Sequence, residues 1–564
     1  MSNAWRSRLQ LPRRRPDLLR VALWLAASCG LLLALAPLLS DAASNAQESP
    51  IERVQLLTFN DFHGNLEPLT MGPADARRQI GGAAVLAAYL DQREQQAQGE
   101  VARTLRVAAG DLIGASPLVS ALQRDEPTIR ALDMLELRYS SVGNHEFDRG
   151  IAELRRLQNG GCAPSTPTPT SGCFPGAGFR YLAANVIDTA TGQPIFPPYL
   201  VEHVRGIPIG FIGIVLKETP TIVPPTGVAG LDFLDEVETV NRYAADLRDQ
   251  GVRAIVVLIH QGGVSRNRQN LVPADSPIVG LVQGFDPDVD VVVSGHTHQI
   301  YVTTVAGKLV TQASAFGRAL VDIRLTLDRT TGDVTEKAAE IVDTFADVPP
   351  GNAPKPAVAT FVARAAATAA PLANRPVGTA ASDITRAPNA AGESALGDLI
   401  ADAQRAQLDT EVAFMNPGGI RADILAGPVT FNSVFTVHPF GNTLVRMTLT
   451  GEQIATLLEQ QFSQSPNRVL QVSGLAYTWD STRPPGTRVD PADIRVGGQP
   501  LVLTQSYDVV ANNFTAAGGD NFTGFTEATN RADTGILDRD ALVDYLQALP
   551  QPFSQTVQSR IQRR

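Results

Sequence analysis

The stretch VQLLTFNDFHGN, residues 54–65, begins with a mostly apolar run, Val54–Phe59, and continues with Asn60, Asp61, Phe62, His63, Gly64 and Asn65. Its aliphatic, β-branched and aromatic residues are typical of a buried strand. Four later strand-like runs also end in polar, metal-competent residues: Gly110-Asp111, Gly143-Asn144-His145-Glu146, His260 and Gly295-His296-Thr297-His298. Because the carboxyl ends of neighbouring strands in an α/β sheet open onto one crevice, we expect these groups to converge.

The mixture of side chains in these motifs indicates a pair of divalent metal ions. Five of the seven histidines belong to the motifs, whereas His203 and His438 lie outside them and are predicted to be structural. Imidazole, carboxylate and amide donors suit Zn, Mn, Fe or Co better than Ca or Mg. Two such ions can hold a phosphoryl group and activate water for in-line attack, with a carboxylate such as Asp111 bridging them. A single motif of this kind would only predict a turn, but five in order predict a site.

The chain of 564 residues is too long for one hydrophobic core, so we expect two domains. Short β-rich runs alternate with helical patterns over residues 51–346, as in a layered α/β domain, and predict six strands at 54–59, 105–109, 140–142, 207–216, 254–259 and 289–293. Residues 347–377 are rich in proline and alanine and predict a linker with a bridging helix at 357–370. A second α/β segment, 378–564, has predicted helices at 394–407 and from Arg539, and predicted strands at 411–415, 444–449 and 507–511.

The amino terminus is predicted to be an export signal over residues 1–46. A basic stretch ends at Arg20, an apolar run follows to Leu39, and small residues then suit signal peptidase. The run of 19 residues, from 21 to 39, is also long enough to span a bilayer, so an uncleaved membrane anchor is the alternative. Either reading places the protein in the periplasm or outside the cell.

Removal of this segment would change the net charge of the chain and leave two cysteines. The formal charge is −10, and loss of residues 1–46, with six arginines and two aspartates, would bring it near −14. A chain this acidic has no general attraction for nucleic-acid polymers or anionic membranes. Cys162 and Cys173 would be the two remaining cysteines, and in an oxidising compartment they are predicted to form a disulfide, with two free loop thiols as the alternative.

The order of motifs resembles the calcineurin-like metallophosphoesterases, specifically their 5′-nucleotidase and UDP-sugar hydrolase branch, over nearly all of residues 51–564. The resemblance implies a four-layer αββα domain joined by a linker helix to a smaller α/β substrate-binding domain. It implies that one metal is held by Asp61, His63 and His298, the other by Asn144, His260 and His296, with Asp111 as the bridge. It also implies that His145 protonates the leaving oxygen and that Asp148 orients His145.

The second domain carries further motifs of the same branch. Asn416-Pro417-Gly418-Gly419-Ile420-Arg421 resembles a segment that contacts the substrate, including through Asn416 and Arg421. Phe440 and Phe514 lie in motifs whose rings sandwich a nucleobase in the family, and Asp520 would bond the ribose hydroxyls. Aromatic stacking on a base is worth about 1–3 kcal/mol. Two core phenylalanines beside glycine-rich turns are the alternative.

The resemblance predicts hydrolysis of 5′-nucleotides to nucleoside and phosphate outside the cytoplasm, with a small nucleotide as the partner molecule. Family members carry an arginine where this chain has Gly392, so a phosphate contact is either missing or supplied by Arg386 or Arg421. The alternatives are a UDP-sugar hydrolase, a 2′,3′-cyclic phosphodiesterase with 3′-nucleotidase activity, or a nucleotide-binding surface protein whose metal centre has decayed. The complete ligand set argues against decay. Metal identity, preferred base and oligomeric state stay open.

Overall fold

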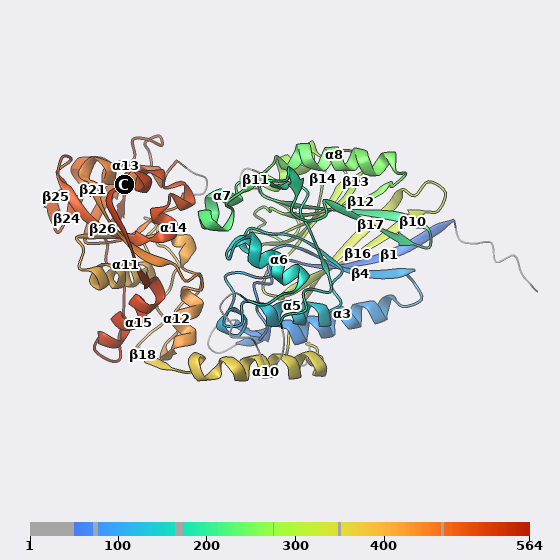
Figure 1. Cartoon of the computed structure of the whole chain (residues 1–564), viewed down its shortest axis with the longest axis horizontal. Coiled ribbons are helices and arrows are strands. Elements are labelled where there is room, and N and C mark those ends of the chain that lie inside the picture. The colour runs from blue at the N-terminus through green and yellow to red at the C-terminus, as the bar shows by residue number, and fades with distance from the viewer. Residues whose placement is uncertain (1–49, 72–76, 164–172, 274–275, 348–350, 464–466) are drawn as a thin grey trace, which may run out of the picture. The chain divides into compact units, whose positions relative to one another are not determined.

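The computed structural model describes residues 50–71, 77–163, 173–273, 276–347, 351–463 and 467–564. The predicted export signal at 1–46 lies outside the described residues. Residues 51–564 form one compact unit that contains all the predicted functional residues. Figure 1 shows its helices and strands in chain order from blue to red.

The first sheet carries three of the five predicted strand-end motifs. Its parallel strands β1, β4, β5 and β6 are extended on one side by the antiparallel pair β16 and β17. In spatial order the strands are β17 (Val334–Asp343), β16 (Ala319–Asp328), β1 (Ile51–Phe59), β4 (Arg103–Ala109), β5 (Tyr139–Ser141) and β6 (Arg180–Leu182).

The second sheet carries the other two motifs. Its four central strands are parallel, and antiparallel strands close both edges. In spatial order the strands are β14 (Ile300–Val305), β15 (Lys308–Ala313), β13 (Val289–Ser294), β12 (Ala254–His260), β10 (Ile207–Val215) and β9 (Tyr199–Val204). The six strands predicted in this half of the sequence are all present, with ends shifted by at most three residues.

The two sheets pack face to face, and helices cover both outer faces. On β1, Leu56 is buried against the second sheet whereas Leu57 is buried against helices, as a period of two requires. The first sheet is covered by α3 (Ala83–Ala97), α5 (Glu126–Met134) and α6 (Ile151–Asn159), and the second by α8 (Glu236–Asp249) and α9 (Pro277–Gly284). This is the predicted four-layer αββα arrangement.

Short elements complete this part of the chain. Cys162 and Cys173 are joined by a disulfide with their Cα atoms 4.5 Å apart, so the predicted pairing is present. The short elements are β2 (Leu69–Met71), β3 (Arg78–Ile80), α4 (Leu118–Ala121), β7 (Val186–Asp188), β8 (Gln193–Pro194), α7 (Thr219–Ile222) and β11 (Leu231–Phe233).

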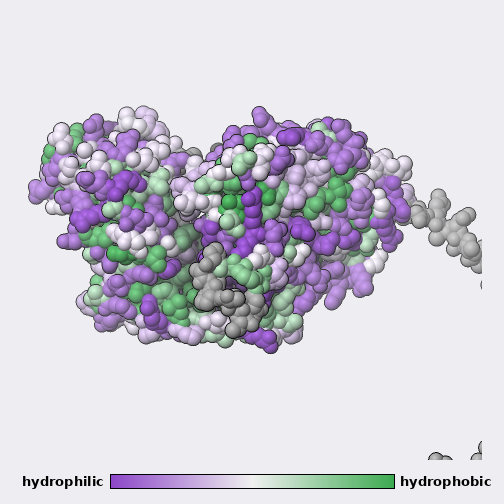
Figure 2. All heavy atoms as spheres, in the orientation of Figure 1, coloured by the Kyte–Doolittle hydropathy of each residue, from purple (hydrophilic) through white to green (hydrophobic). Residues whose placement is uncertain are grey.

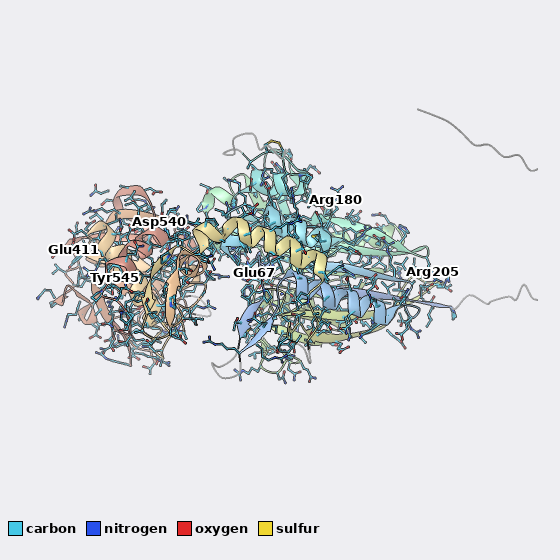
Figure 3. All side chains as sticks on the ribbon, turned by 90° about the horizontal axis from the view of Figure 1, so that it is seen from below. Glu67, Arg180, Arg205, Glu411, Asp540 and Tyr545 are labelled. Carbon is cyan, nitrogen blue, oxygen red and sulfur yellow. A yellow bond between two sulfur atoms is a disulfide. The ribbon has the colours of Figure 1, made fainter. Side chains whose placement is uncertain are left out.

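Helix α10 (Pro356–Ala373) connects the part of the chain from β1 to β17, the first region, to the part from β18 to β28, the second region, as its yellow ribbon shows in Figures 1 and 3. Within the described residues it is the one helix whose length and composition would suit a membrane span. Its residues Val358, Val362 and Ala365 are instead buried in the core of the first region. Packing therefore accounts for its apolar face.

The second region is a five-stranded sheet with helices on both faces. Helices α11 and α15 pack on one face and α13 on the other. The strands, in spatial order, are β22 (Gln471–Ser473), β19 (Val412–Met415), β26 (Ser506–Asn512), β21 (Thr443–Thr450) and β27 (Thr529–Leu537). The helices are α11 (Ala395–Leu408), α12 (Phe431–Val437), α13 (Gly451–Gln460), α14 (Asn513–Ala516) and α15 (Asp538–Ala548).

Two smaller sheets flank this one. The first pairs β18 (Pro376–Ala380) with β20 (Gly427–Thr430). The second contains β25 (Gln499–Pro500), β24 (Arg495–Val496), β23 (Leu475–Trp479) and the carboxy-terminal β28 (Ile561–Arg563). Over the face shown in Figure 2, hydrophilic and hydrophobic residues are intermixed, which is normal for a folded surface.

Candidate active site

The predicted metal ligands lie at the carboxyl ends of β1, β4, β5, β12 and β13, where the two sheets meet. Five of them have left-handed backbones, with φ between 46° and 72°: Asp61, His63, Asp111, His296 and His298. Positive φ is uncommon for residues other than glycine and costs free energy, so the surrounding structure must impose it. Backbone bonds from Asp61 N to Gly110 O (3.1 Å) and from His63 N to Asp111 O (2.9 Å) join the first two ligand loops.

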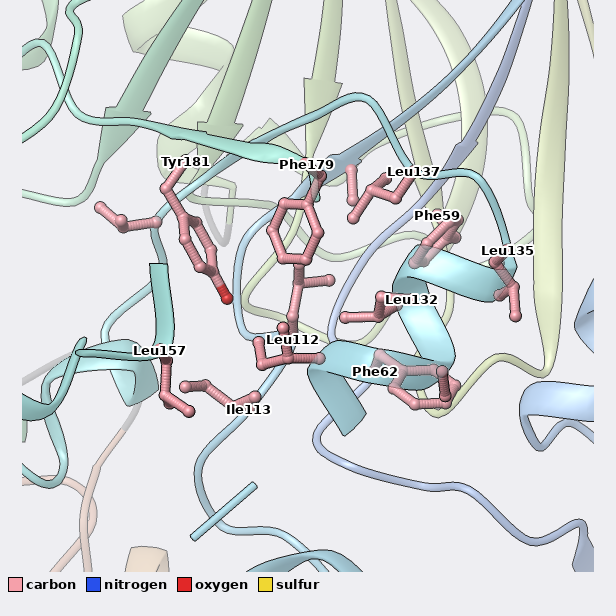
Figure 4. Close-up of a cluster of buried hydrophobic side chains, with 14 of the residues drawn as sticks. Phe59, Phe62, Leu112, Ile113, Leu132, Leu135, Leu137, Leu157, Phe179 and Tyr181 are labelled. Carbon is pink, nitrogen blue, oxygen red and sulfur yellow. The ribbon is translucent and has the colours of Figure 1, made fainter. Parts of the chain in front are cut away.

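Apolar neighbours hold these loops in place. Phe62 lies between two of the predicted ligands and is fully buried, and Leu112 and Ile113 directly follow Asp111. Figure 4 shows these three side chains in one cluster with Phe59 and Leu132. The ligand loops are therefore anchored in the core between the first sheet and its helices.

The structure brings the predicted ligands together in two adjoining groups. The donor atoms of Asp61, His63 and His298 lie within 4.8 Å of one another, as do those of Asp111, His260 and His296. Asp111 Oδ2 lies 3.0 Å from His260 Nε2 and 3.6 Å from His63 Nε2, so it reaches both groups. Its place between them is the one that a bridging carboxylate requires.

Asn144, the remaining predicted ligand, belongs to the second group. Its Oδ1 lies 3.1 Å from His296 Nδ1. The ring of His260 is held by an Nδ1–H donated to Ala109 O (2.8 Å), and His63 makes the same bond to Gly114 O (2.9 Å). Because a carbonyl can only accept, both imidazoles present Nε2 to the site, as metal ligands do.

The electrostatics of the cluster suit cation binding. Burial lowers the pKa of His63 and of His296 to about 3, so both rings are neutral at neutral pH. Burial alone would raise the pKa of Asp111, but His260 and His145 hold it well below its usual value. Burial also disfavours a charged His260, yet Asp111 raises its pKa to about 9. A metal ion bound here would displace the proton from the His260 ring.

His145 opens a short 3₁₀ turn, His145–Phe147, directly after the Asn144 ligand. Its Nδ1 lies 2.9 and 3.1 Å from the two carboxylate oxygens of Asp148. Its backbone N donates to Asp111 Oδ1 (2.8 Å). Burial lowers the pKa of His145, but Asp148 and Asp111 outweigh it and raise the pKa overall. An imidazole that Asp148 orients, with a raised pKa, thus lies beside the predicted metal ligands. The donor atoms of His63, Asp111 and His145 also cluster within 4.8 Å, so a ligand role for His145 is the alternative that metal content must test.

Glu146 links two of the predicted ligand loops, a role that was not predicted from the sequence. Its carboxylate is buried and accepts from the backbone N–H groups of Gly143 (2.6 Å), Asp111 (2.9 Å) and Leu112 (2.8 Å). The hydroxyl of Tyr181 donates to the same carboxylate at 3.2 Å. Glu146 therefore ties the Asp111 loop to the Asn144 loop. Its position inside the Gly-Asn-His-Glu motif was the available signal.

Glycine is required where the ligand loops approach each other. A Cβ added to Gly143 would lie 2.2 Å from Asp111 Oδ1, and one added to Gly295 would lie 2.7 Å from Ala109 O. Both contacts are far shorter than real Cβ contacts. The Asp111 carboxylate can therefore occupy its place only because residue 143 has no side chain.

A cavity of about 260 Å³ joins this cluster to the second region. From the first region it is lined by Asn144, His145, Asp148 and His296. All the substrate residues predicted in the second region line the same cavity: Asn416, Gly418, Gly419, Arg421, Phe440, Phe514 and Asp520. Five further lining residues were not predicted, because they lie outside the quoted motifs or were not singled out within them: Ile222, Pro224, Pro417, Asn442 and Arg468.

Asn416 and Asp520 form a buried network at the end of the cavity that lies in the second region. Asn416 Nδ2 donates to Asp520 Oδ2 (2.9 Å), and Asn416 Oδ1 accepts from Asn512 Nδ2 (3.0 Å). Arg468 forms an ion pair with the other oxygen of Asp520. Asn416 thus helps to orient Asp520, whose carboxylate is held between the Asn416 amide and the Arg468 guanidinium.

The structure separates the two arginines that could contact a phosphate. Arg421 lines the cavity beside His145, and burial together with Arg386 lowers its pKa. No ion pair to its guanidinium exists among the residues that the structure describes. Arg386 lines a neighbouring cavity of about 510 Å³, and its Nη1 donates to Ile420 O (3.2 Å). At Gly392, φ is 95° and an added Cβ would lie 2.6 Å from Val469, so an arginine does not fit there.

Comparison with known families covers most of the chain. Residues 55–300 match the family of calcineurin-like phosphoesterases, and residues 372–527 match the 5′-nucleotidase C-terminal domain. These two ranges contain all the residues of the metal cluster and of the predicted substrate site.

Three individual proteins show the extent of the similarity. The cell wall protein Lmo0130 of Listeria monocytogenes is 35% identical over 87% of this chain and 67% of its own length. The endonuclease YhcR of Bacillus subtilis is 33% identical over 91% of this chain, which spans only 41% of the length of YhcR. The crystal structure of a 5′-nucleotidase precursor from Thermus thermophilus superposes with a TM-score of 0.77 at 30% identity, over 91% of this chain and 99% of that one.

Proposed function

Because the chain belongs to the 5′-nucleotidase family of calcineurin-like phosphoesterases, we propose that it is an exported, metal-dependent phosphomonoesterase that hydrolyses 5′-nucleotides to nucleoside and phosphate. We further propose domain limits of 51–346 for the catalytic domain, 347–377 for the linker and 378–564 for the nucleotide-binding domain. Helix α10 lies within the proposed linker, and β18 begins at Pro376, near the carboxyl end of that linker.

The residues present fit two divalent ions of the kind that the family implies. One ion would be held by Asp61, His63 and His298, the other by Asn144, His260 and His296, with Asp111 between them. Neutral imidazoles with carboxylate and amide oxygens suit Zn, Mn, Co or Fe. When bound, the metal pair would supply Lewis acidity toward water and the phosphoryl group.

The remaining chemistry falls to side chains on the cavity wall. His145, held by Asp148 and with a raised pKa, would give a proton to the leaving 5′-oxygen. Arg421 would meet the phosphate oxygens, since it lines the same cavity and has no ion-pair partner among the described residues. Its cationic charge would stabilise the transition state.

The nucleoside would occupy the end of the cavity that lies in the second region. Phe440 and Phe514 would stack on the base, and Asp520 would accept from the ribose hydroxyls. The observation that most directly supports this proposal is that one cavity is lined both by His145, the predicted proton donor, and by Phe440, Phe514 and Asp520. Such an arrangement fits a substrate with a phosphate at one end and a nucleoside at the other.

Export is proposed from three features. They are the predicted signal at 1–46, the disulfide between Cys162 and Cys173, and the similarity to a protein named as a cell wall protein. We propose that the enzyme acts on free nucleotides rather than on nucleic-acid polymers, because the formal net charge of the chain is −10 and phosphate polymers would be repelled.

One phosphate-release panel tests the function. Purified protein would be assayed with AMP, ADP, UDP-glucose, 3′-AMP, 2′,3′-cyclic AMP and a 5′-phosphorylated oligonucleotide. We expect AMP to have the highest kcat/KM, and we expect exhaustive chelation to abolish activity that Mn²⁺, Co²⁺ or Zn²⁺ restores. A preference for UDP-glucose or the cyclic nucleotide would favour the alternative activities on the same scaffold, and full activity after chelation would refute the metal mechanism.

A further inference from the structure

Phe440 lies against the imidazole ring of His145. The two ring centroids are 5.6 Å apart and the rings are within 17° of parallel, so they stack. Phe440 follows α12 in the second region, whereas His145 follows β5 in the first. The residue expected to hold the base therefore also contacts the group expected to protonate the leaving oxygen.

Asp148 and His63 also contact the His145 ring. Asp148 holds Nδ1 by a hydrogen bond of 2.9 Å, which restrains one edge of the ring. The ring of His63 meets His145 edge-on, with centroids 5.1 Å apart. A hydrogen bond at one ring nitrogen fixes that atom, but the imidazole ring can still rotate about it. A ring stacked on its face opposes that tilt and keeps water off the hydrogen bond to Asp148.

We propose that Phe440 is a positioning residue for His145, in addition to any contact with the base. The proposal rests on the proposed phosphomonoesterase function and deepens it, because it makes the proton donor of the first region depend on a side chain of the second. A base stacked on Phe440 would press that ring toward His145. A nucleotide would then help to order its own proton donor, so that binding energy at the base appears in kcat.

The contact separates two roles that a single assay on AMP would mix. Ribose 5-phosphate has the same scissile ester as AMP but no base. If Phe440 only stacks on the base, Phe440→Ala leaves ribose 5-phosphate turnover unchanged. If Phe440 also positions His145, we expect kcat for ribose 5-phosphate to fall by about tenfold with little change in KM, as for a misplaced catalytic group. Phe440→Tyr keeps the ring and is expected to restore kcat to within about twofold.

A double-mutant cycle decides whether the loss acts through His145. In the His145→Ala background, Phe440→Ala is expected to change kcat for ribose 5-phosphate by less than about twofold, because the group that it positions is gone. An unchanged kcat in the single Phe440→Ala variant, or a full additional tenfold loss in the double variant, would overturn the proposal.

A spectroscopic measurement tests the stack independently of turnover. In zinc-loaded protein with ¹³C-labelled histidine, the ring signal of His145 is assigned from its loss in His145→Ala. Removal of the aromatic ring in Phe440→Leu should shift that signal downfield, since ring-current shielding above the ring is lost. An unchanged signal would show that the rings do not stack. Failure of wild-type protein to hydrolyse AMP while it hydrolyses ribose 5-phosphate would refute the nucleotide function alone, because the cycle is scored on the sugar phosphate.

Discussion

Glu146→Ala is expected to damage stability and metal binding together, although Glu146 itself is not a predicted ligand. The substitution removes the acceptor for the backbone N–H groups of Asp111, Gly143 and Leu112 and for the Tyr181 hydroxyl. Each buried donor left without a partner costs about 1–3 kcal/mol. Water that enters the space left by the side chain recovers part of this, so we expect a net loss of about 3–5 kcal/mol.

The assay combines thermal unfolding with metal content. A loss of this size should lower the Tm by roughly 3–8 °C, because the entropy of unfolding grows with chain length, and the freed Asp111 loop should leave the protein with less than its full two equivalents of metal. Glu146→Gln retains one oxygen acceptor but turns an amide N–H₂ toward a donor, so its effect should be intermediate. Glu340→Ala is the matched control, because that carboxylate is 64% exposed and its loss should matter little. A Glu146→Ala protein with wild-type Tm and full metal content would refute this reasoning.

Four further outcomes are expected. Asp111→Ala should abolish AMP hydrolysis and weaken both metal sites; AMP hydrolysis by this variant at the wild-type rate would rule out a bridging role for Asp111. His145→Ala should lower kcat by about 10²–10⁴-fold with both metals retained; loss of one equivalent would instead identify His145 as a ligand. Phe514→Ala should lower kcat/KM for AMP by about ten- to a hundredfold, from roughly 1–3 kcal/mol of stacking, and equal losses on ribose 5-phosphate with a lower Tm would mean a core residue. Mass spectrometry of exported protein should find Cys162 and Cys173 linked, and two free thiols there would contradict both the bond and the oxidising location.

Much of the candidate site was predictable because its residues follow a local rule. Asp61, Asp111, Asn144, His260 and His296 each lie at or just after the end of a buried strand, and strand ends in such sheets converge. The layered fold followed from the same alternation of strands and helices. Glu146 was inside a recognised motif, yet its role was not predicted, since a buried acceptor for backbone N–H groups has no pattern of its own.

The amino-acid sequence by itself determined which donors are present, their order and the elements that carry them, because hydrophobic periodicity and the residues at strand ends are properties of neighbouring positions. Only the tertiary structure decided which of these side chains meet. Asn416 and Asp520 are 104 residues apart, and Phe440 reaches His145 from another part of the chain. Periodicity states which face of an element is buried but not what it is buried against. The pairing of His145 with Phe440 therefore depends on how the second region packs on the first, and that of Asp520 with Arg468 on how the second region folds on itself.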